Sequence, residues 1–325
     1  MTEPLLSVEG LHTHFFVDAG VVKAVDGVGF NIRRGEVVGL VGESGCGKSV
    51  TSLSIAGLIE PPGRIVEGSV RFDGTELVGA SERVLNSVRG PRIAMIFQQP
   101  RASLDPVMSV GRQIGQALKA GTGMDRPARR RRAVELLDRV GISDPERRVR
   151  EYPHQLSGGM AQRVMIAIAL AGEPDLLIAD EPTTALDVTV QAQILELLRE
   201  LQSANGMAVI LISHDLGVIA EIADRAAVMY AGRIVEECAV SELYDAPLHP
   251  YTLGLMESRP AAAQSKRRLR VIPGSVPVPH DLPVGCRFAP RCAPRVESGL
   301  TACTEQAPDP VSPRDGHHVR CWLHG

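Results

Sequence analysis

Short apolar runs separated by amphipathic stretches occupy most of this chain. Near the N-terminus, Leu5–Phe16 and Val21–Ile32 alternate apolar with polar side chains, and this period of two predicts an antiparallel hairpin. Continuous apolar runs follow at Val37–Val41, Ile93–Phe97, Asp175–Asp180 and Val209–Ser213. Such runs are typical of strands buried on both faces, so the pattern predicts an α/β fold with an antiparallel β subdomain and a mostly parallel core sheet.

Two regions depart from this alternation. Residues 101–172 show helical spacing, and we expect a helical subdomain there, including a helix that Arg129–Arg132 opens and that ends near Val140. Beyond residue 259 the chain contains 10 of its 23 prolines, and 9 Lys and Arg against 5 Asp and Glu. We therefore predict one large domain over 1–259 and a small, loop-rich C-terminal extension over 260–325.

Composition limits the class of protein. A chain of 325 residues with 44% hydrophobic content can bury a large core, and its net charge of −3 argues against nucleic acid as a partner. The run Arg129–Arg132 is interpreted as a solvated helix face. No apolar run approaches the ~18 residues of a membrane helix, and Met1–Pro4 has no basic-then-apolar secretion signal. We expect a protein of the cytoplasm, or one docked on the membrane from the cytoplasmic side.

A glycine-rich loop joins the apolar run Val37–Val41 to a predicted helix at Val50–Ala56. Its glycines let successive backbone N–H groups face an anion, and the helix N-terminus adds a partial positive charge. Lys48 is placed to reach the β- and γ-phosphates of a nucleotide, and the Ser49 hydroxyl to bind Mg²⁺. We predict an ATP-binding loop made of Gly42, Glu43, Ser44, Gly45, Cys46, Gly47, Lys48, Ser49 and Val50.

Polar side chains end the other three apolar runs. Asp180 and Glu181 close one run, and they suit an outer ligand of Mg²⁺ and the base or orienting group for the attacking water. His214 follows a second run and can hydrogen-bond the γ-phosphate. Gln98 follows the third and can reach Mg²⁺ or the water, with Gln99 as the alternative. Open α/β sheets place ligands at such strand ends, which makes this edge the predicted catalytic site.

These side chains also have purely structural explanations. Paired acids such as Asp180 and Glu181 can cap a strand against solvent, and a single histidine is usually structural. The phosphate-binding loop elsewhere in the chain favours the catalytic interpretation, because both kinds of group are needed to hydrolyse a nucleotide.

A second glycine-rich segment is Leu156–Met160, with the sequence LSGGM. We do not expect it to bind phosphate inside its own subunit. The order phosphate loop, Gln98, LSGGM, LLIADE, Ala185–Asp187 and His214 resembles the motif set of the nucleotide-binding subunits of ATP-binding cassette (ABC) transporters, over residues 1 to about 240. The resemblance implies a phosphate-loop ATPase whose active site is completed by a second subunit.

The resemblance also implies roles for single residues. In that family, Ser157, Gly158 and Gly159 bind the γ-phosphate of the ATP held by the opposite subunit, and Asp187 lies at the dimer interface. Family members stack an aromatic side chain on adenine. Here that implies Phe15, which fits the strand alternation better than Phe16, although either ring can instead belong to the core.

Other segments resemble the ATPase subunits of bacterial dipeptide and oligopeptide importers: His249–Thr252, Pro273–Pro277, Cys286–Cys292, Gln99–Pro106 and Tyr152–Ser157. This narrower resemblance implies a second ATPase subunit, with a paralogue favoured, two membrane permease subunits and, indirectly, an external solute-binding protein. It places the chain peripherally on the cytoplasmic face of the cell membrane. Peptide cargo follows from the resemblance alone, and nickel or oligosaccharide import remains open.

Two other classes of protein compete with a transport ATPase. A soluble ATPase of the same superfamily would act in DNA repair or translation, but such proteins usually carry a coiled-coil insertion or two cassettes, and this sequence has neither. In a redox-responsive regulatory protein, the cysteine-rich tail would be the principal function and the ATPase a switch.

Four of the six cysteines fall in the last 40 residues, at Cys286, Cys292, Cys303 and Cys321. A tail this rich in proline and loops gains from a cross-link, and a reducing cytosol disfavours disulfides. Zinc suits four thiolates, but the spacing lacks the paired C-x₂-C of structural zinc sites. Peptide-import ATPases that this chain resembles are associated with an iron–sulfur cluster at such cysteines. This implies a [4Fe–4S] cluster, with Zn²⁺ as the alternative and Cys46 and Cys238 uninvolved.

Overall fold

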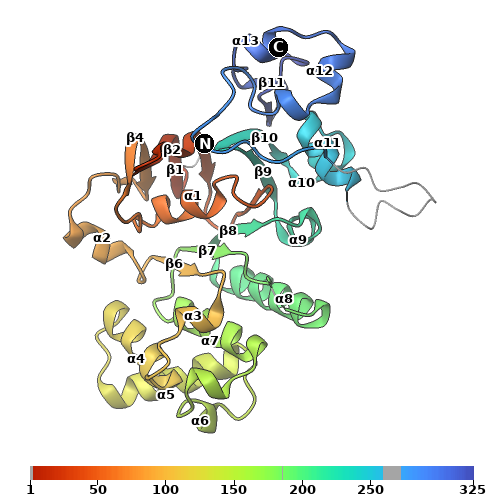
Figure 1. Ribbon diagram of the computed structural model, residues 1–325. Helices are drawn as coiled ribbons and strands as arrows, with labels where there is room; N and C mark the ends of the chain where they lie inside the picture. Colours follow the sequence, from red (N-terminus) through yellow and green to blue (C-terminus); the bar gives the residue numbers. More distant parts are fainter. Residues whose placement is uncertain (1–2, 185, 259–271) are drawn as a thin grey trace. The chain divides into compact units, whose positions relative to one another are not determined.

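The computed structural model describes residues 3–184, 186–258 and 272–325, which fold into two compact units (Figure 1). The helical unit consists mainly of Gly79–Ile212, with Arg33–Glu36 and the described residues before Leu6. The phosphate-loop unit consists of Leu6–Ile32, Val37–Val78 and the described residues from Ser213 onward. Residues 272–325 of the predicted extension thus belong to the phosphate-loop unit, and 260–271 lie outside the described residues. The boundary at residue 259 stays a prediction.

The alternating N-terminal segments form the predicted hairpin. Strands β1 (Leu6–Val17) and β2 (Gly20–Ile32) pair in antiparallel fashion. Strand β4 (Gly63–Phe72) pairs with the other edge of β1, and β5 (Thr75–Glu76) completes a sheet of order β2-β1-β4-β5. Apolar side chains on one face of this sheet are buried, as the period of two predicts.

The phosphate-loop unit contains a second group of strands. The first, β3 (Val37–Val41), is buried along its whole length and pairs in parallel with β9 (Arg225–Tyr230), which pairs in antiparallel fashion with β10 (Arg233–Ala239). The helices of this unit before the tail are α1 (Lys48–Ile55), α9 (Leu216–Ile222), α10 (Val240–Asp245) and α11 (Pro250–Glu257).

The tail extends this group of strands. Strand β12 (His317–Val319) pairs with β10, and β11 (Val311–Arg314) pairs with β12. Three short helical segments precede them: η3 (Ala289–Arg291), α12 (Ala293–Glu297) and α13 (Ala302–Glu305). Figure 1 shows α12, α13 and β11 beside one another near the C-terminus.

The helical unit contains the three remaining parallel strands. They are β6 (Ile93–Ile96), β7 (Leu176–Asp180) and β8 (Ala208–Ser213), and β7 pairs in parallel with both neighbours. Because Ile96 pairs with Ala179, the carboxyl ends of β6 and β7 lie at the same edge. The predicted strands and their parallel pairing are therefore confirmed.

Helices occupy most of residues 101–172, and the bounds of a helical subdomain there stay a prediction. The helices of this unit are α2 (Glu82–Val88), α3 (Pro100–Ser103), α4 (Val110–Gly121), α5 (Arg126–Arg139), α6 (Pro145–Arg148), η1 (Pro153–Gln155), α7 (Gly158–Leu170) and α8 (Val188–Asn205). Figure 1 shows α4, α5 and α6 gathered away from β6 and β7 within this unit.

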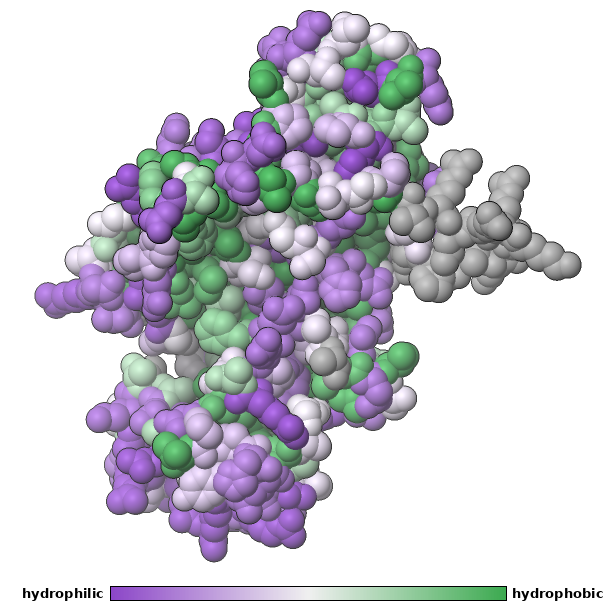
Figure 2. Space-filling model, in the orientation of Figure 1, coloured by the Kyte–Doolittle hydropathy of each residue, from purple (hydrophilic) through white to green (hydrophobic). Residues whose placement is uncertain are grey.

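Helix α5 begins three residues before the predicted arginine run, because the Asp125 side chain accepts a hydrogen bond from the Ala128 N–H and caps the helix there. Arg130 and Arg131 are exposed, as expected for a solvated helix face. The surface over α4 to α6 is mainly hydrophilic on the side that Figure 2 shows. Within the described residues, no helix has the length and apolar character needed to cross a membrane.

Candidate functional site

The predicted phosphate loop leaves β3 at Val41 and enters α1 at Lys48. Gly47 caps α1 with a φ of 107°, and a Cβ there would overlap the carbonyl oxygen of Ala24, so the position requires glycine. The Lys48 Nζ donates hydrogen bonds to the carbonyl oxygens of Gly42 at 2.8 Å and Glu43 at 3.0 Å. The ammonium group thus lies inside the loop at a helix N-terminus, an arrangement that suits a polyphosphate.

The other loop residues differ in exposure. Ser44 and Gly45 are exposed, Ser49 and Val50 are half-buried, and Cys46 is only 1% exposed. Burial raises the pKa of the Cys46 thiol, despite the positive charge of Lys48 nearby. Cys46 is therefore a packing residue of the loop and not a reactive thiol.

The two candidate adenine-stacking rings lie in different surroundings on β1. Phe15 is half-buried, and its ring lies directly over Gly63. Phe16 is 39% exposed, with the Arg64 guanidinium carbon 4.3 Å from the ring centroid. The stacking role given to Phe15 stays a prediction.

In the helical unit, two predicted catalytic side chains meet. Gln98 donates a hydrogen bond from Nε2 to Glu181 Oε2 at 2.8 Å, and the Thr184 hydroxyl donates to the same oxygen at 2.8 Å. Both residues follow strands whose carboxyl ends share an edge, which explains the contact. Gln99 instead occupies the N-cap position of α3, and this geometry favours Gln98 over Gln99.

Glu181 has a constrained backbone. Its φ is 47°, a left-handed value that is uncommon for a residue with a side chain, and its N–H donates to the carbonyl oxygen of Ile212 at 3.0 Å. Asp180, immediately before it, is only 5% exposed at the end of β7. Such strain is often stored where a side chain must be aimed at a reacting group.

The LSGGM segment opens α7. Ser157 is the N-cap and its Oγ accepts a hydrogen bond from the Met160 N–H at 3.2 Å. Ser157 and Gly158 are exposed, so the N-terminus of this 13-residue helix faces outward from its own unit. A Cβ on Gly159 would lie 3.0 Å from Val190 Cγ1, which shows how closely the starts of α7 and α8 approach. The exposed helix N-terminus can receive an anion from another molecule.

Asp187 caps α8 in the same way, accepting a hydrogen bond from the Val190 N–H at 3.0 Å. The structure therefore brings Asp187 and the LSGGM turn together in one unit. The place of Asp187 at a dimer interface stays a prediction. Ala185, the first residue of that motif, lies outside the described residues.

His214 belongs to the phosphate-loop unit. It is exposed in the junction between β8 and α9, and Asp215 beside it caps α9 by accepting a hydrogen bond from the Gly217 N–H at 2.7 Å. Its role at the γ-phosphate stays a prediction.

Arg101 has a contact that the sequence did not predict. Its Nη2 donates to the carbonyl oxygen of Leu156 at 2.8 Å, the residue before Ser157. A segment that starts at Gln98 is thereby connected to the LSGGM turn. No sequence signal marks an isolated arginine for such a contact.

The four tail cysteines line a single pocket, together with His249, Phe288, Arg295 and Trp322. Burial raises the pKa of each thiol, and that of Cys321 reaches about 12. Neighbouring thiolates would add repulsion, so four thiolates can coexist here only with a cation that neutralises them.

The only group of three potential metal ligands within 4.8 Å of one another, among the described residues, is Glu236, Cys238 and His317. Glu236 already accepts hydrogen bonds from the N–H groups of Leu248 and His249, and His317 Nε2 lies 2.7 Å from it. These bonds explain the buried carboxylate as a structural tie between β10, β12 and the chain before α11.

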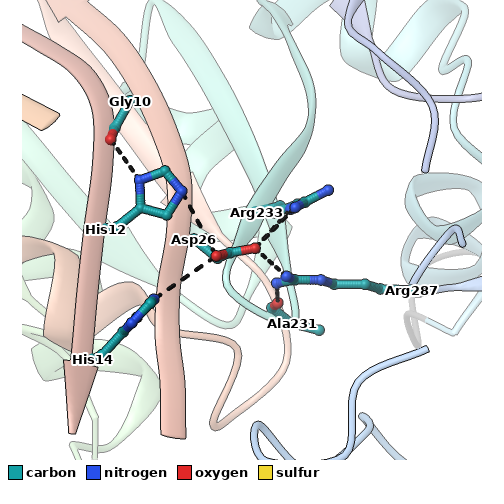
Figure 3. Close-up of polar contacts among 7 residues, drawn as sticks. All are labelled: Gly10, His12, His14, Asp26, Ala231, Arg233 and Arg287. Atoms are coloured by element: carbon teal, nitrogen blue, oxygen red, sulfur yellow. Dashed lines mark hydrogen bonds and ion pairs between the residues drawn. The ribbon is translucent and has the colours of Figure 1, made fainter. Parts of the chain in front are cut away.

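A buried charge cluster surrounds Asp26 on β2 (Figure 3). Arg233 donates to Asp26 Oδ2 at 2.9 Å, Arg287 also donates to it, and His12 and His14 lie 3.7 and 3.8 Å from the other oxygen. Burial raises the pKa of Asp26, but the charges of Arg287 and Arg233 outweigh it and hold that pKa below its usual value. Burial and Arg233 lower the pKa of Arg287 to about 10. The cluster joins the hairpin to the tail.

Known proteins resemble the chain over nearly its whole length. Residues 25–184 match the family model of the ABC transporter, and residues 235–298 match that of the oligopeptide/dipeptide transporter C-terminal region. The Oligopeptide transport ATP-binding protein AppD of Bacillus subtilis is 50% identical over 98% of this chain and 97% of that protein. The Dipeptide transport ATP-binding protein DppD of Escherichia coli is 49% identical over 98% and 96%.

A solved structure agrees with these matches. The ATP-binding cassette MJ0796, solved as a dimer in a post-hydrolysis state with ADP and Pi, has a TM-score of 0.66 and 30% identity, covering 72% of this chain and 98% of that one. The chain therefore belongs to the ABC transporter family of ATP-binding proteins, in the branch that carries the oligopeptide/dipeptide transporter C-terminal region.

Proposed function

We propose that this chain is the ATP-hydrolysing subunit of a bacterial ABC importer for dipeptides or oligopeptides. One observation supports this most strongly: a single chain combines the ABC cassette with the oligopeptide/dipeptide C-terminal region. Relatives named for oligopeptide and dipeptide transport align over almost the entire length of both chains.

In the proposed cycle, ATP bound at the phosphate loop of one subunit is covered by the LSGGM turn of a second. Binding closes the dimer and drives the membrane permease, and hydrolysis resets it. The exposed N-terminus of α7, with Ser157 and Gly158 uncovered by their own unit, supports the trans arrangement. The second subunit is expected to be a paralogue.

Within each site, we assign the phosphates to the loop and to Lys48. Glu181 orients or deprotonates the attacking water, and Gln98 holds the Glu181 carboxylate at 2.8 Å. His214 is assigned to the γ-phosphate.

The residues proposed for Mg²⁺ are Ser49, Gln98 and Asp180. They offer a hydroxyl, an amide oxygen and a carboxylate, and such oxygen donors fit a hard cation that is shared with the phosphates. When bound, the ion would neutralise charge that develops on the transferred phosphoryl group.

We assign the contact with the permease to Gln98–Pro106. Arg101 to Ser103 are exposed on α3, and Val107 beyond them is 83% exposed. A cysteine at Ser103 should form a cross-link with a permease subunit on the cytoplasmic face of the membrane. Failure to cross-link, with a cysteine at exposed Glu200 as the control, would contradict this contact.

The decisive experiment is reconstitution. The chain, its paralogue and two permease subunits are purified together into vesicles, and ATPase activity is measured with a dipeptide-loaded solute-binding protein. We expect stimulation by peptide and none with Lys48→Ala. If only nickel- or oligosaccharide-loaded binding proteins stimulate the ATPase activity, the assignment of peptides as the cargo is wrong. Failure to associate with any permease would favour the alternative of a soluble ATPase with a redox-responsive tail.

We also propose that Cys286, Cys292, Cys303 and Cys321 hold one [4Fe–4S] cluster. They line one pocket, and their raised pKa values require a cation if all four are to be thiolates. A zinc ion bound to four thiolates at about 2.3 Å draws them within about 4 Å of one another. The spacing of the four cysteines along the chain lacks the paired C-x₂-C of structural zinc sites, which favours the cluster over zinc.

Analysis of iron, sulfide and zinc tests this proposal. Anaerobically purified chain should be brown, with about four irons per chain. The Cys286→Ser variant should lose the colour, and Cys238→Ala should keep it. Colourless protein with stoichiometric zinc would contradict the proposal. Bleaching of the cluster without loss of ATPase activity would show that the tail does not regulate hydrolysis.

A further inference from the structure

The segment Cys286–Cys292, here called the cysteine turn, contacts the phosphate loop directly. It contains two buried arginines, Arg287 and Arg291, with exposed fractions of 9% and 7%. Their partners are Asp26 on the hairpin and Glu43 in the loop. Buried arginines need charged partners, so each contact is built into the fold.

Arg291 forms a bidentate ion pair with Glu43 through both Nη atoms of its guanidinium. Nη1 donates to Glu43 Oε2 at 2.6 Å and Nη2 donates to Oε1 at 3.0 Å. Nε donates to the carbonyl oxygen of Pro273 at 2.8 Å, and Nη1 also reaches the Tyr230 hydroxyl at 3.3 Å. This bidentate geometry fixes the carboxylate in direction as well as position.

The Arg291 side chain is also held by packing. Its guanidinium lies 5.7 Å from the Tyr230 ring centroid and 5.9 Å from that of Phe288. An arginine side chain stays protonated at any working pH, so the charge of Arg291 persists. The pair is therefore a permanent contact of the folded unit.

The backbone of Glu43 connects Arg291 to Lys48, the lysine assigned to the phosphates. Its N–H donates to the Tyr251 hydroxyl at 2.8 Å, and its carbonyl oxygen accepts a hydrogen bond from Lys48 Nζ at 3.0 Å. The rings of Tyr230, Tyr251 and Phe288 pack together with centroids 4.7 to 5.5 Å apart. The loop is thus held at Glu43 by a side chain and a hydroxyl that both come from the C-terminal part of the chain.

The cysteine turn reaches the loop a second time through Arg287. This residue donates to the carbonyl oxygen of Ala231, in the turn between β9 and β10. The next residue, Gly232, donates its N–H to the carbonyl oxygen of Cys46 at 2.8 Å. Two separate paths therefore lead from the cysteine turn to the phosphate loop.

We propose that Arg291 is a positioning residue for ATP binding. By fixing Glu43, it holds the loop in the conformation that presents Lys48 and the backbone N–H groups to the phosphates. A loop ordered in advance loses less entropy when the nucleotide binds, so affinity rises without any contact between Arg291 and ATP. A C-terminal region that is remote in sequence thereby contributes to the nucleotide site.

The inference rests on the proposed ATP binding, and the experiment separates the two. ATP affinity is measured by titration calorimetry on the full chain in a Glu181→Gln background, which prevents turnover. Comparison of the chain that has no further substitution with the Lys48→Ala variant tests ATP binding itself. Arg291→Met, which keeps much of the apolar packing, tests the inference. Arg314→Met, at an exposed arginine on β11, is the matched control.

We expect Arg291→Met to weaken ATP binding by about tenfold, and Arg291→Lys by less, since one charge-assisted bond is retained. In the reconstituted transporter, KM for ATP should rise with kcat nearly unchanged. Arg314→Met should alter neither quantity. If Lys48→Ala loses ATP and Arg291→Met binds it like the wild type, the pair only attaches the tail and the inference is wrong.

A double-mutant cycle with Glu43→Gln tests the path of the effect. If Arg291 acts through Glu43, the double variant should bind ATP no more weakly than the worse single variant. Additive losses would contradict the inference. Should Arg291→Met fail to fold, by circular dichroism and thermal melting, Arg291→Lys and Glu43→Gln still form a cycle that can be measured.

Discussion

Among single residues, Glu181 in the helical unit has the most constrained carboxylate of the predicted catalytic side chains. Glu181 has a left-handed φ of 47°, and both Gln98 and Thr184 donate hydrogen bonds to its Oε2. The carboxylate is therefore held in place as an acceptor, which is what orienting or deprotonating water requires.

Glu181→Gln should keep ATP binding and lose turnover, because the amide retains the shape of the side chain without its charge. Phosphate release should fall by at least a factor of ~10², the range of general-base catalysis. Equilibrium binding of ATP should stay close to the wild type. Glu173→Gln, at an exposed acid before β7, is the control; a rate above about a tenth of the wild type would refute the assigned role.

Asp26 is a second residue whose carboxylate is the partner of several charged side chains. Its depressed pKa means that the folded state favours the carboxylate, so its contribution is complete well above pH 3.8 and is lost as pH falls through the folded pKa. Asp26→Asn leaves Arg287 buried without its charge partner and should lower the free energy of unfolding at pH 7 by about 3 kcal/mol. Urea unfolding at several pH values measures it.

The difference between wild type and Asp26→Asn should begin to shrink below about pH 4, where the unfolded carboxyl takes up a proton, and should be lost as pH falls through the lower folded pKa. Asp18→Asn, at the exposed tip of the same hairpin, should show no such difference. A gap that is unchanged from pH 7 to pH 3 would mean that the Asp26 charge does not stabilise the fold.

At the scale of elements, capping determines where the functional helices start. The side chains of Ser157 and Asp187 cap α7 and α8 by accepting backbone N–H groups. Each cap stabilises its helix and also fixes the position of a motif. At the start of α7, Ser157 and Gly158 are exposed, so in the proposed trans arrangement the helix N-terminus can face an ATP held by another subunit.

Ser157→Arg should block ATP hydrolysis while leaving the ATP affinity of the separated subunit within about twofold, because the turn acts on the partner's nucleotide. Steady-state hydrolysis and monomer titrations measure the two effects. Asp125→Ala removes a cap of the same kind from α5, costs about 1 kcal/mol of stability and should keep full activity. A large loss of monomer affinity in Ser157→Arg would rule out the trans arrangement.

At the scale of the whole molecule, the tail and the nucleotide site are not separate modules. The cysteine turn lies against the phosphate loop through Arg291 and against the hairpin through Arg287. Whatever orders the four cysteines also orders these two arginines, because Arg287 and Arg291 each adjoin a cysteine in the sequence. The binding of metal in the tail and the binding of nucleotide at the phosphate loop should therefore be thermodynamically coupled.

Removing the tail metal should weaken ATP binding in the same direction as Arg291→Met. Cys292→Ser should lower iron content, melting temperature and ATP affinity together. Hydrogen exchange should increase at Arg287–Arg291 and at Glu43. Cys238→Ala serves as the control, with full iron content and unchanged affinity. Loss of iron with unchanged ATP affinity and exchange would show that the cluster and the loop are independent.

The parts of the site that are local in the chain could be predicted from the amino-acid sequence. The phosphate loop, its strand and its helix are contiguous, so glycine spacing and one apolar run sufficed to predict them. The shared edge that holds Gln98 and Glu181 also followed, because both residues end strands of a parallel sheet, but the hydrogen bond between them was not predicted. The helix boundary at Arg126 was missed by three residues, since the cap Asp125 lay outside the charge run used to place it.

The contacts between groups that are distant in the chain became evident from the folded structure alone. Arg291 and Glu43 are 248 residues apart, and Arg287 and Asp26 are 261 apart. No periodicity links such residues, and charged side chains in a proline-rich tail look solvated in a linear sequence. Their burial depends on the path of the chain through β10, β12 and the cysteine turn. Hydrophobic pattern predicts elements, but ion pairs between elements exist only once packing has excluded water and brought the charges within reach.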